Sequence, residues 1–265
     1  MLSCILGAFA HRFSRRHALF TKSPLRQNDY SNIRTAILNS ALAIIDRSPG
    51  DSGGRERRLA RTQAEIETAV LAARDLFWRT GFDETSIDDV VAATGFNRYA
   101  LYSEFGGKRE VFLAALDRYH LERKQIFMAG LADEAAPPID AIRDVFEFCI
   151  DEMASRGTGC FMCNVAGEIA ARDPVVRERI ATYLEQINLA FGMALERAAE
   201  RGELNTNLSP TDGVRIFVTL IMGLGMAAQH GADRQDMLAT LEATLASISP
   251  LGDPSARARR KKSVN

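Results

Sequence analysis

Apolar residues recur at intervals of three and four along most of the chain after residue 61. The clearest stripe is made of Ile66, Ala69, Val70, Ala73, Leu76 and Phe77. This spacing places apolar side chains on one face of an α-helix. β-Branched residues are sparse, and the sequence has no alternating run flanked by hairpin turns. The pattern predicts an all-α protein of about nine helices separated by short Gly- or Pro-containing breakers.

Three consecutive helix starts stand out in the first part of this pattern. Thr62-Gln-Ala-Glu65 is a capping box, in which a hydroxyl and a carboxylate each satisfy an unpaired amide. Thr85-Ser-Ile-Asp88 predicts a second box before a short helix that ends at Thr94-Gly95. Asn97 is placed to cap a third helix, from Arg98 to about Glu104.

Two short helices joined by a Gly-containing turn predict a helix-turn-helix, whose second helix is shaped to enter the major groove of DNA. Arg98 is the best candidate to read a guanine edge, and Lys108 to hold a phosphate. Tyr99 and Tyr102 are candidates for phosphates or thymine methyl groups. The predicted DNA-binding residues are Ser86, Asn97, Arg98, Tyr99, Tyr102, Ser103 and Lys108.

This stretch resembles the signature of the TetR-type bacterial transcriptional regulators in order and spacing. The residues that carry the resemblance are Ala72-Ala-Arg-Asp-Leu-Phe77, Gly81-Phe-Asp-Glu-Thr85, Ile87, Val90, Gly95, Leu101-Tyr102, Phe105 and Lys108. The chain departs from the usual pattern at Phe96, where Val is common, and at Tyr99, where a small residue is common. These departures concern which bases are read, since the rest of the run is present.

The resemblance implies an N-terminal three-helix DNA-binding domain, a linking fourth helix and a larger C-terminal helical domain that binds a ligand and dimerises. It also implies a homodimer on palindromic, double-stranded operator DNA, released by a small-molecule effector. We place the DNA-binding domain at residues 61–118 and the ligand-binding and dimerisation domain at 119–250. Residues 1–60 and the basic tail 251–265 are predicted to be poorly ordered.

The C-terminal half contains candidates for a pocket and an interface. Apolar helices near 141–149 and 161–169 could line an effector site, although half or more of their large side chains belong to the core in any case. The candidate pocket residues are Phe146, Cys149, Met153, Phe161 and Met162. The segments 211–229 and 233–247 predict either a subunit interface, built as a four-helix bundle with a twofold mate, or an internal core.

Charge and cysteine usage refine this picture. The formal net charge is −1, and residues 62–118 carry six Lys or Arg against ten Asp or Glu. An acidic DNA-binding module needs cations from elsewhere, and the arm 55–61 is predicted to supply them.

Four cysteines, Cys4, Cys149, Cys160 and Cys163, are too few for a disulfide scaffold and indicate free thiols in a reducing cytoplasm.

Cys160-Phe-Met-Cys163 has the spacing of a redox dithiol, which leaves two interpretations open: small buried thiols, or a thiol-based redox-sensing regulator. A metal site here would lack two ligands, so no metal is expected. No phosphate-binding Gly loop, Gly-x-Ser-x-Gly elbow or His-Glu-x-x-His helix is present, which argues against an enzyme with or without a cofactor.

The uncharged stretch 216–228 is shorter than the ~20 residues that span a bilayer, so no membrane contact is expected. The leading hypothesis is a TetR-type repressor that binds DNA and responds to a ligand. The alternative from another class is a helical adaptor that has lost DNA binding, which the acidic module would suit.

Overall fold

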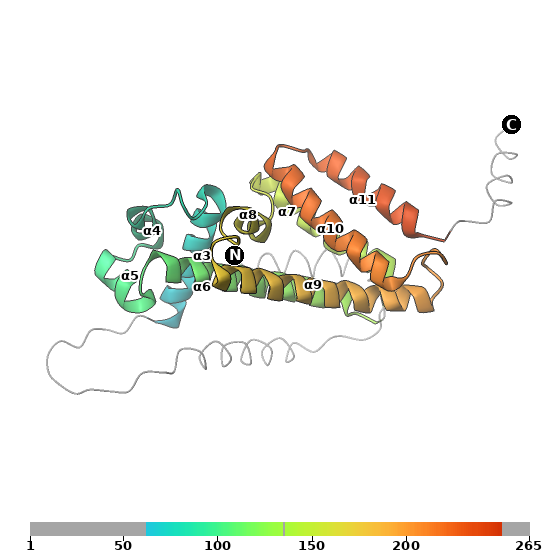
Figure 1. Ribbon diagram of the computed structural model, residues 1–265, viewed down its shortest axis with the longest axis horizontal. Coiled ribbons are helices and arrows are strands. Elements are labelled where there is room, and N and C mark those ends of the chain that lie inside the picture. The colour runs from blue at the N-terminus through green and yellow to red at the C-terminus, as the bar shows by residue number, and fades with distance from the viewer. Residues whose placement is uncertain (1–61, 135, 251–265) are drawn as a thin grey trace, which may run out of the picture. The chain divides into compact units, whose positions relative to one another are not determined.

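The computed structural model describes residues 62–134 and 136–250. The predicted extension 1–60 and tail 251–265 lie outside the described residues. The described residues belong to one compact unit of the chain, which begins at residue 62. Its described part contains nine α-helices and no strand, which confirms the all-α prediction. The helices are α3 (Gln63–Thr80), α4 (Ile87–Thr94), α5 (Arg98–Phe105), α6 (Lys108–Leu131), α7 (Pro138–Arg156), α8 (Phe161–Glu168), α9 (Pro174–Glu200), α10 (Pro210–Gln229) and α11 (Arg234–Ile248) (Figure 1).

Local sequence sets the starts of the first helices. The Thr62 hydroxyl accepts from the Glu65 amide at 3.3 Å, and the Glu65 carboxylate accepts from the Thr62 amide at 2.7 Å, as predicted. The second box was predicted one residue too early, because the N-cap of α4 is Ser86 and its partner is Asp89. Thr85 is buried instead, and its hydroxyl donates to the carbonyl of Gly81 at 2.5 Å.

Helices α3 and α5 pack against α6, and α4 packs against α3 and α5 (Figure 1). Phe77 of α3 lies edge-on to Phe112 of α6, with ring centroids 5.1 Å apart. The same α6 continues past residue 118 and packs along α7 and α9. One continuous helix therefore passes through the predicted domain boundary and connects the helix-turn-helix to the rest of the described chain.

The core of the C-terminal part is built from α7, α9, α10 and the C-terminal half of α6, with α11 covering α7 and α10. Its centre is an aromatic cluster in which neighbouring ring centroids are 5.5–5.6 Å apart. These rings belong to Phe127, Phe146, Phe191 and Phe217. Such ring pairs add about 0.5–1.5 kcal/mol each beyond the area they bury, so the cluster is a main source of stability here.

Helix α10 is the most apolar helix of the described chain. It is the one helix there that is long and apolar enough to cross a membrane by length and composition alone, a test that soluble core helices also pass. It packs against α7, α8, α9 and α11. Its remaining face is apolar and open, because Met222 and Met226 are exposed while Phe217 and Ile221 are buried.

Candidate nucleic-acid interface

The helix-turn-helix consists of α4, a three-residue turn and α5. Gly95 ends α4 in the left-handed conformation, with φ 70°, and its amide donates to the carbonyl of Val91. Phe96 is buried in the turn, and its ring lies 6.1 Å from that of Phe105. Phe105 lies in the last turn of α5 and is half buried.

Helix α5 has one buried side and one open side. Ala100 and Leu101 are buried against the module. Tyr99 and Tyr102 are 70% and 52% exposed, values rare for aromatic side chains that belong to a core. Asn97, Arg98 and Ser103 are exposed as well, so five of the predicted DNA-binding residues share the solvent-facing side of α5.

Two of the predicted residues already serve as helix caps. The Asn97 side-chain oxygen accepts from the amide of Ala100 at 2.8 Å, and the Ser86 hydroxyl accepts from the amide of Asp89 at 3.1 Å. Both residues therefore fix the first turns of α5 and α4. Because the N-terminus of a helix carries partial positive charge, the two caps also orient the helix ends that favour an anion.

Lys108, the predicted phosphate ligand, begins α6 after Gly107. Its ammonium lies 4.3 Å from the ring centroid of Phe82, and the residue is half buried. The aromatic face holds the charge near the loop between α3 and α4 while leaving part of it open to solvent.

Arg98 is held by an ion pair across the helix-turn-helix. Its Nη2 lies 2.5 Å from Oδ1 of Asp88, which is in the first turn of α4. Both side chains are more than half exposed, so the pair contributes little to stability. The pair places the carboxylate of Asp88 directly beside Arg98, the residue predicted to bind a guanine edge.

The loop between α3 and α4 is fastened to α8, at a distance of more than 80 residues in sequence. One carboxylate oxygen of Glu168 accepts from the amide of Asp83 at 2.8 Å, and the other accepts from the amide of Phe82 at 3.2 Å. Arg172 forms an ion pair with Asp83 beside these bonds. Glu168, the last residue of α8, therefore satisfies backbone donors in the loop that precedes the helix-turn-helix.

A second link joins the start of α6 to the start of α9. The guanidinium of Arg109 donates from Nε and Nη2 to the two carboxylate oxygens of Asp173, at 3.0 and 3.1 Å. Asp173 also caps α9 by accepting from the amides of Val175 and Val176. The two-pronged bond fixes the angle between these helices more strictly than a single contact would.

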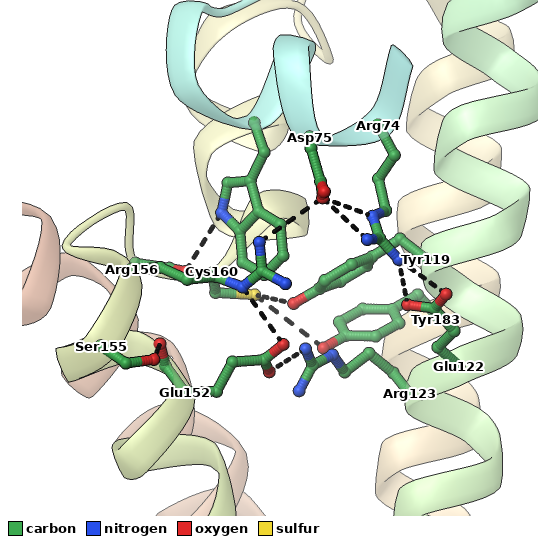
Figure 2. A network of polar contacts seen from close by, with 12 residues as sticks. Arg74, Asp75, Tyr119, Glu122, Arg123, Glu152, Ser155, Arg156, Cys160 and Tyr183 are labelled. Carbon is green, nitrogen blue, oxygen red and sulfur yellow. Dashed lines mark hydrogen bonds and ion pairs between the residues drawn. The ribbon is translucent and has the colours of Figure 1, made fainter. Parts of the chain in front are cut away.

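A network of buried polar groups lies between α3, α6, α7 and α9, which we call the polar core (Figure 2). Arg123 is fully buried, pairs with Glu152 and lies 4.7 Å from the ring centroid of Tyr119. Arg74, also buried, binds both oxygens of Glu122 at 2.6 Å. Burial raises the pKa of Glu122. Each buried charge here has a partner of opposite sign, as the low-dielectric interior requires.

Cys160 lies at the edge of the polar core, as its yellow sulfur shows in Figure 2. Its Sγ is 3.4 Å from the hydroxyl of Tyr119 and 4.0 Å from that of Tyr183. Burial raises the pKa of both tyrosines, so they remain neutral hydroxyl groups. Cys149, Cys160 and Cys163 are all free thiols in the described structure, which agrees with the prediction for these three; Cys4 lies outside the described residues.

The five predicted pocket residues are all buried, but they fall into different groups. Phe146 belongs to the aromatic cluster of α6, α7, α9 and α10, whereas Phe161 lies 5.6 Å from Tyr119 at the polar core. Two hollows of the described chain are lined by other residues. One lies beside His120 and Tyr183, and one of about 220 Å³ lies beside Trp78 and Thr158. The pocket therefore stays a prediction.

The sequence analysis did not identify several residues that make the interhelical contacts and the polar core. Arg123 had a signal, because it stands on the stripe of Tyr119, Ile126 and Phe127, where a charge is out of place and calls for a buried partner. Glu168 and Asp173 had none, since an acidic residue at the end or start of a helix is common on any surface. Their roles depend on contacts between distant segments.

Comparisons with known proteins agree with this geometry. A family profile described as bacterial regulatory proteins, tetR family, matches residues 70–115, and one described as tetracyclin repressor-like, C-terminal domain, matches 138–259. The regulator YezE of Bacillus subtilis, itself an uncharacterized HTH-type protein, is 31% identical over 145 residues, which are 53% of this chain and 74% of that protein. The HTH-type transcriptional repressor ComR of Escherichia coli is 27% identical over 181 residues, 68% of this chain and 86% of its own.

A solved structure has the same fold. It is a cysteine mutant of the TetR family regulator CifR in complex with 26-bp double-strand operator DNA, with a TM-score of 0.60 and 21% identity, covering 74% of this chain and all of that one. The helix-turn-helix, the helical C-terminal part and these relatives define a helix-turn-helix transcription regulator. The chain belongs to the tetR family of bacterial regulatory proteins. That family consists of regulators rather than enzymes.

Proposed function

We propose that the protein is a cytoplasmic repressor that binds operator DNA through α5 and leaves it when a small molecule binds the C-terminal part. The carrying observation is the open side of α5, where Arg98, Tyr99 and Tyr102 are exposed although their neighbours Ala100 and Leu101 are buried. The name of ComR, a repressor, and the operator complex of CifR support this reading.

The proposed contacts follow from side-chain chemistry and position. The planar guanidinium of Arg98 suits the two acceptors of a guanine edge. Tyr99 and Tyr102 reach phosphates or thymine methyl groups beside it, and Lys108 neutralises a phosphate. Ser86 and Asn97 contribute small polar groups at the N-termini of α4 and α5, where backbone amides also attract phosphate, and Ser103 adds a hydroxyl on the exposed side of α5.

We also propose that the two parts of the chain have separate functions. Residues 61–118 read DNA, and 119–250 bind the effector and dimerise, with α6 belonging to both. The open apolar face of α10 supports a homodimer, because Met222 and Met226 would be covered by the same face of a twofold mate. We place the effector site near Cys149 and Phe161, which border the polar core. An apolar surface lies there beside a few polar groups, which is the usual composition of a small-molecule site.

The test is a fluorescence-anisotropy titration of the full-length protein on DNA from upstream of its own gene. Binding is expected to be saturable and to weaken steeply as salt rises, because only phosphate contacts give that dependence. Arg98→Ala is expected to weaken binding by about tenfold or more, since a bidentate base contact contributes about 1–3 kcal/mol.

Arg143→Ala is the matched control. It removes the same charge and breaks ion pairs to Asp140 and Glu242, but it lies on α7. The Arg143→Ala variant should bind DNA with the same affinity as the unmodified protein. If the protein did not bind DNA, or if binding did not depend on salt, the repressor hypothesis would be refuted. The result would favour the alternative of a helical adaptor that has lost DNA binding.

Asp88→Asn should strengthen DNA binding by about two- to fivefold. The carboxylate holds Arg98 at 2.5 Å in the free protein and repels phosphates, and an exposed pair of this kind has a strength of about 0.2–1 kcal/mol. Asp117→Asn is the control, because it removes the same charge from an exposed pair with Arg179, between α6 and α9. Equal effects of the two variants on the anisotropy titration would show that only net charge matters.

A further inference from the structure

Cys160 and Cys163 share the first turn of α8. Cys160 is the N-cap residue, in extended conformation, and Cys163 is the third residue of the helix. Side chains three positions apart on a helix have Cβ atoms about 5–6 Å apart, and a disulfide draws them to about 3.8 Å. A bond between the two sulfurs is therefore within reach of a small adjustment of this turn.

The surroundings make the two thiols unlike one another. A hydrogen bond from the Cys163 thiol to the Cys160 sulfur lowers the pKa of Cys160, and a hydrogen bond from Tyr119 and the charge of Arg123 act in the same direction. The same bond to Cys160 raises the pKa of Cys163, and burial adds to it. Burial also raises the pKa of Cys149, to about 12. The lowered pKa favours the thiolate of Cys160 over the thiolates of Cys149 and Cys163.

The turn that carries Cys160 is tightly enclosed. The carbonyl of Gly159 accepts from the indole Nε1 of Trp78 at 3.2 Å. A Cβ atom on Gly225 of α10 would come within 2.8 Å of the Cβ of Cys160. A change in this turn therefore meets α3 on one side and α10 on the other.

Helix α8 connects this turn to the DNA-facing module. It is eight residues long, or about 12 Å, and ends at Glu168, which holds the amides of Phe82 and Asp83. A shift of its first turn is transmitted along the helix, because the intrahelical hydrogen bonds keep it rigid. The loop before α4 then loses or changes its anchor.

We propose that Cys160 and Cys163 form a redox site, which peroxide converts to a disulfide that moves α8 and weakens DNA binding. The Cys160 thiolate attacks one oxygen of hydrogen peroxide, the O–O bond breaks, and a sulfenic acid and hydroxide result. The Cys163 sulfur then attacks the Cys160 sulfur, its proton leaves with the hydroxyl group as water, and the S–S bond forms. Peroxide is reduced and the two thiols are oxidised. The effect on DNA rests on the proposed function, while the disulfide does not.

The test uses the full-length protein, reduced or treated with hydrogen peroxide. Trypsin should release a peptide of residues 157–172 that contains both cysteines, lighter by about 2 Da after oxidation. Trp78 is the only tryptophan of the chain, so its fluorescence should change as Gly159 moves and should recover with dithiothreitol. The dissociation constant for upstream DNA should rise by about tenfold, within the usual range for coupled sites.

Variants separate the roles of the thiols. Cys163→Ser should stop at the sulfenic acid, which dimedone traps on Cys160, and Cys160→Ser should not react. Cys4→Ser, which leaves both thiols of the site in place, should respond like the unmodified protein. Glu168→Gln should still form the disulfide but show a smaller change in DNA affinity, since its contact to the loop is already weakened.

The outcomes distinguish the two proposals. If the reduced protein does not bind DNA, the repressor fails, whereas the peptide mass and Trp78 fluorescence still decide the redox site. An absent mass change, or a disulfide that leaves Trp78 fluorescence unchanged, overturns the redox site. So does release from DNA by peroxide that persists in the Cys160→Ser, Cys163→Ser double variant.

Discussion

Replacing Gly159 with alanine is expected to lower the free energy of unfolding by about 2–5 kcal/mol. Gly159 has φ +65°, where a side chain adds about 1–2 kcal/mol of strain. Its new methyl group would also overlap the carbonyl oxygen of Gly225, which belongs to the backbone of α10 and cannot rotate away. Overpacking of this kind costs about 1–3 kcal/mol more. Urea unfolding followed by circular dichroism measures the change.

Gly157→Ala is a matched control two residues away. Gly157 has nearly the same φ, +64°, but a Cβ atom there meets nothing within 4 Å. It should therefore show the strain alone, about 1–2 kcal/mol. Equal losses for the two variants would mean that the turn before Cys160 moves freely away from α10, contrary to the tight enclosure described above.

Arg123→Met is expected to lower the free energy of unfolding by about 3–5 kcal/mol, the range for removing one partner of a buried ion pair. Arg123 is fully buried, and without it Glu152 keeps only Arg156, at 3.5 Å. The methionine fills much of the same volume, so the loss is mainly electrostatic. Urea unfolding at a fixed protein concentration gives the comparison.

A double variant identifies the cause. Arg123→Met with Glu152→Met removes both charges, and it should recover most of the lost stability because apolar residues of similar size replace buried pairs well. Arg143→Met, in a less buried pair on α7, should cost less than about 1 kcal/mol. If the double variant were less stable than Arg123→Met alone, the loss of the main partner of Glu152 would not be the cause.

Local signals in the sequence predicted a large part of this protein. Thr62, Glu65 and Asn97 cap helices where they were expected to, because a cap is made by residues three positions apart and needs no distant partner. The apolar stripes likewise predicted the helices, the helix-turn-helix and the side of α5 that faces solvent. Even the error at α4 was local: both Thr85 and Ser86 offer a hydroxyl, and the competing bond of Thr85 to Gly81 decided between them.

The tertiary structure decided how these helices are coupled. That Arg123 faces Glu152, that Glu168 holds the loop at Phe82, and that Gly159 lies against Gly225 depends on segments 29 to 86 residues apart. The sequence marks each of these residues only by its type, and type does not specify a partner. Burial does, because a charge or an amide removed from water is stable only beside a group that satisfies it. The sequence by itself therefore determined the class of protein and its helix-turn-helix, while packing alone determined how α8 connects the turn of Cys160 to the loop before α4.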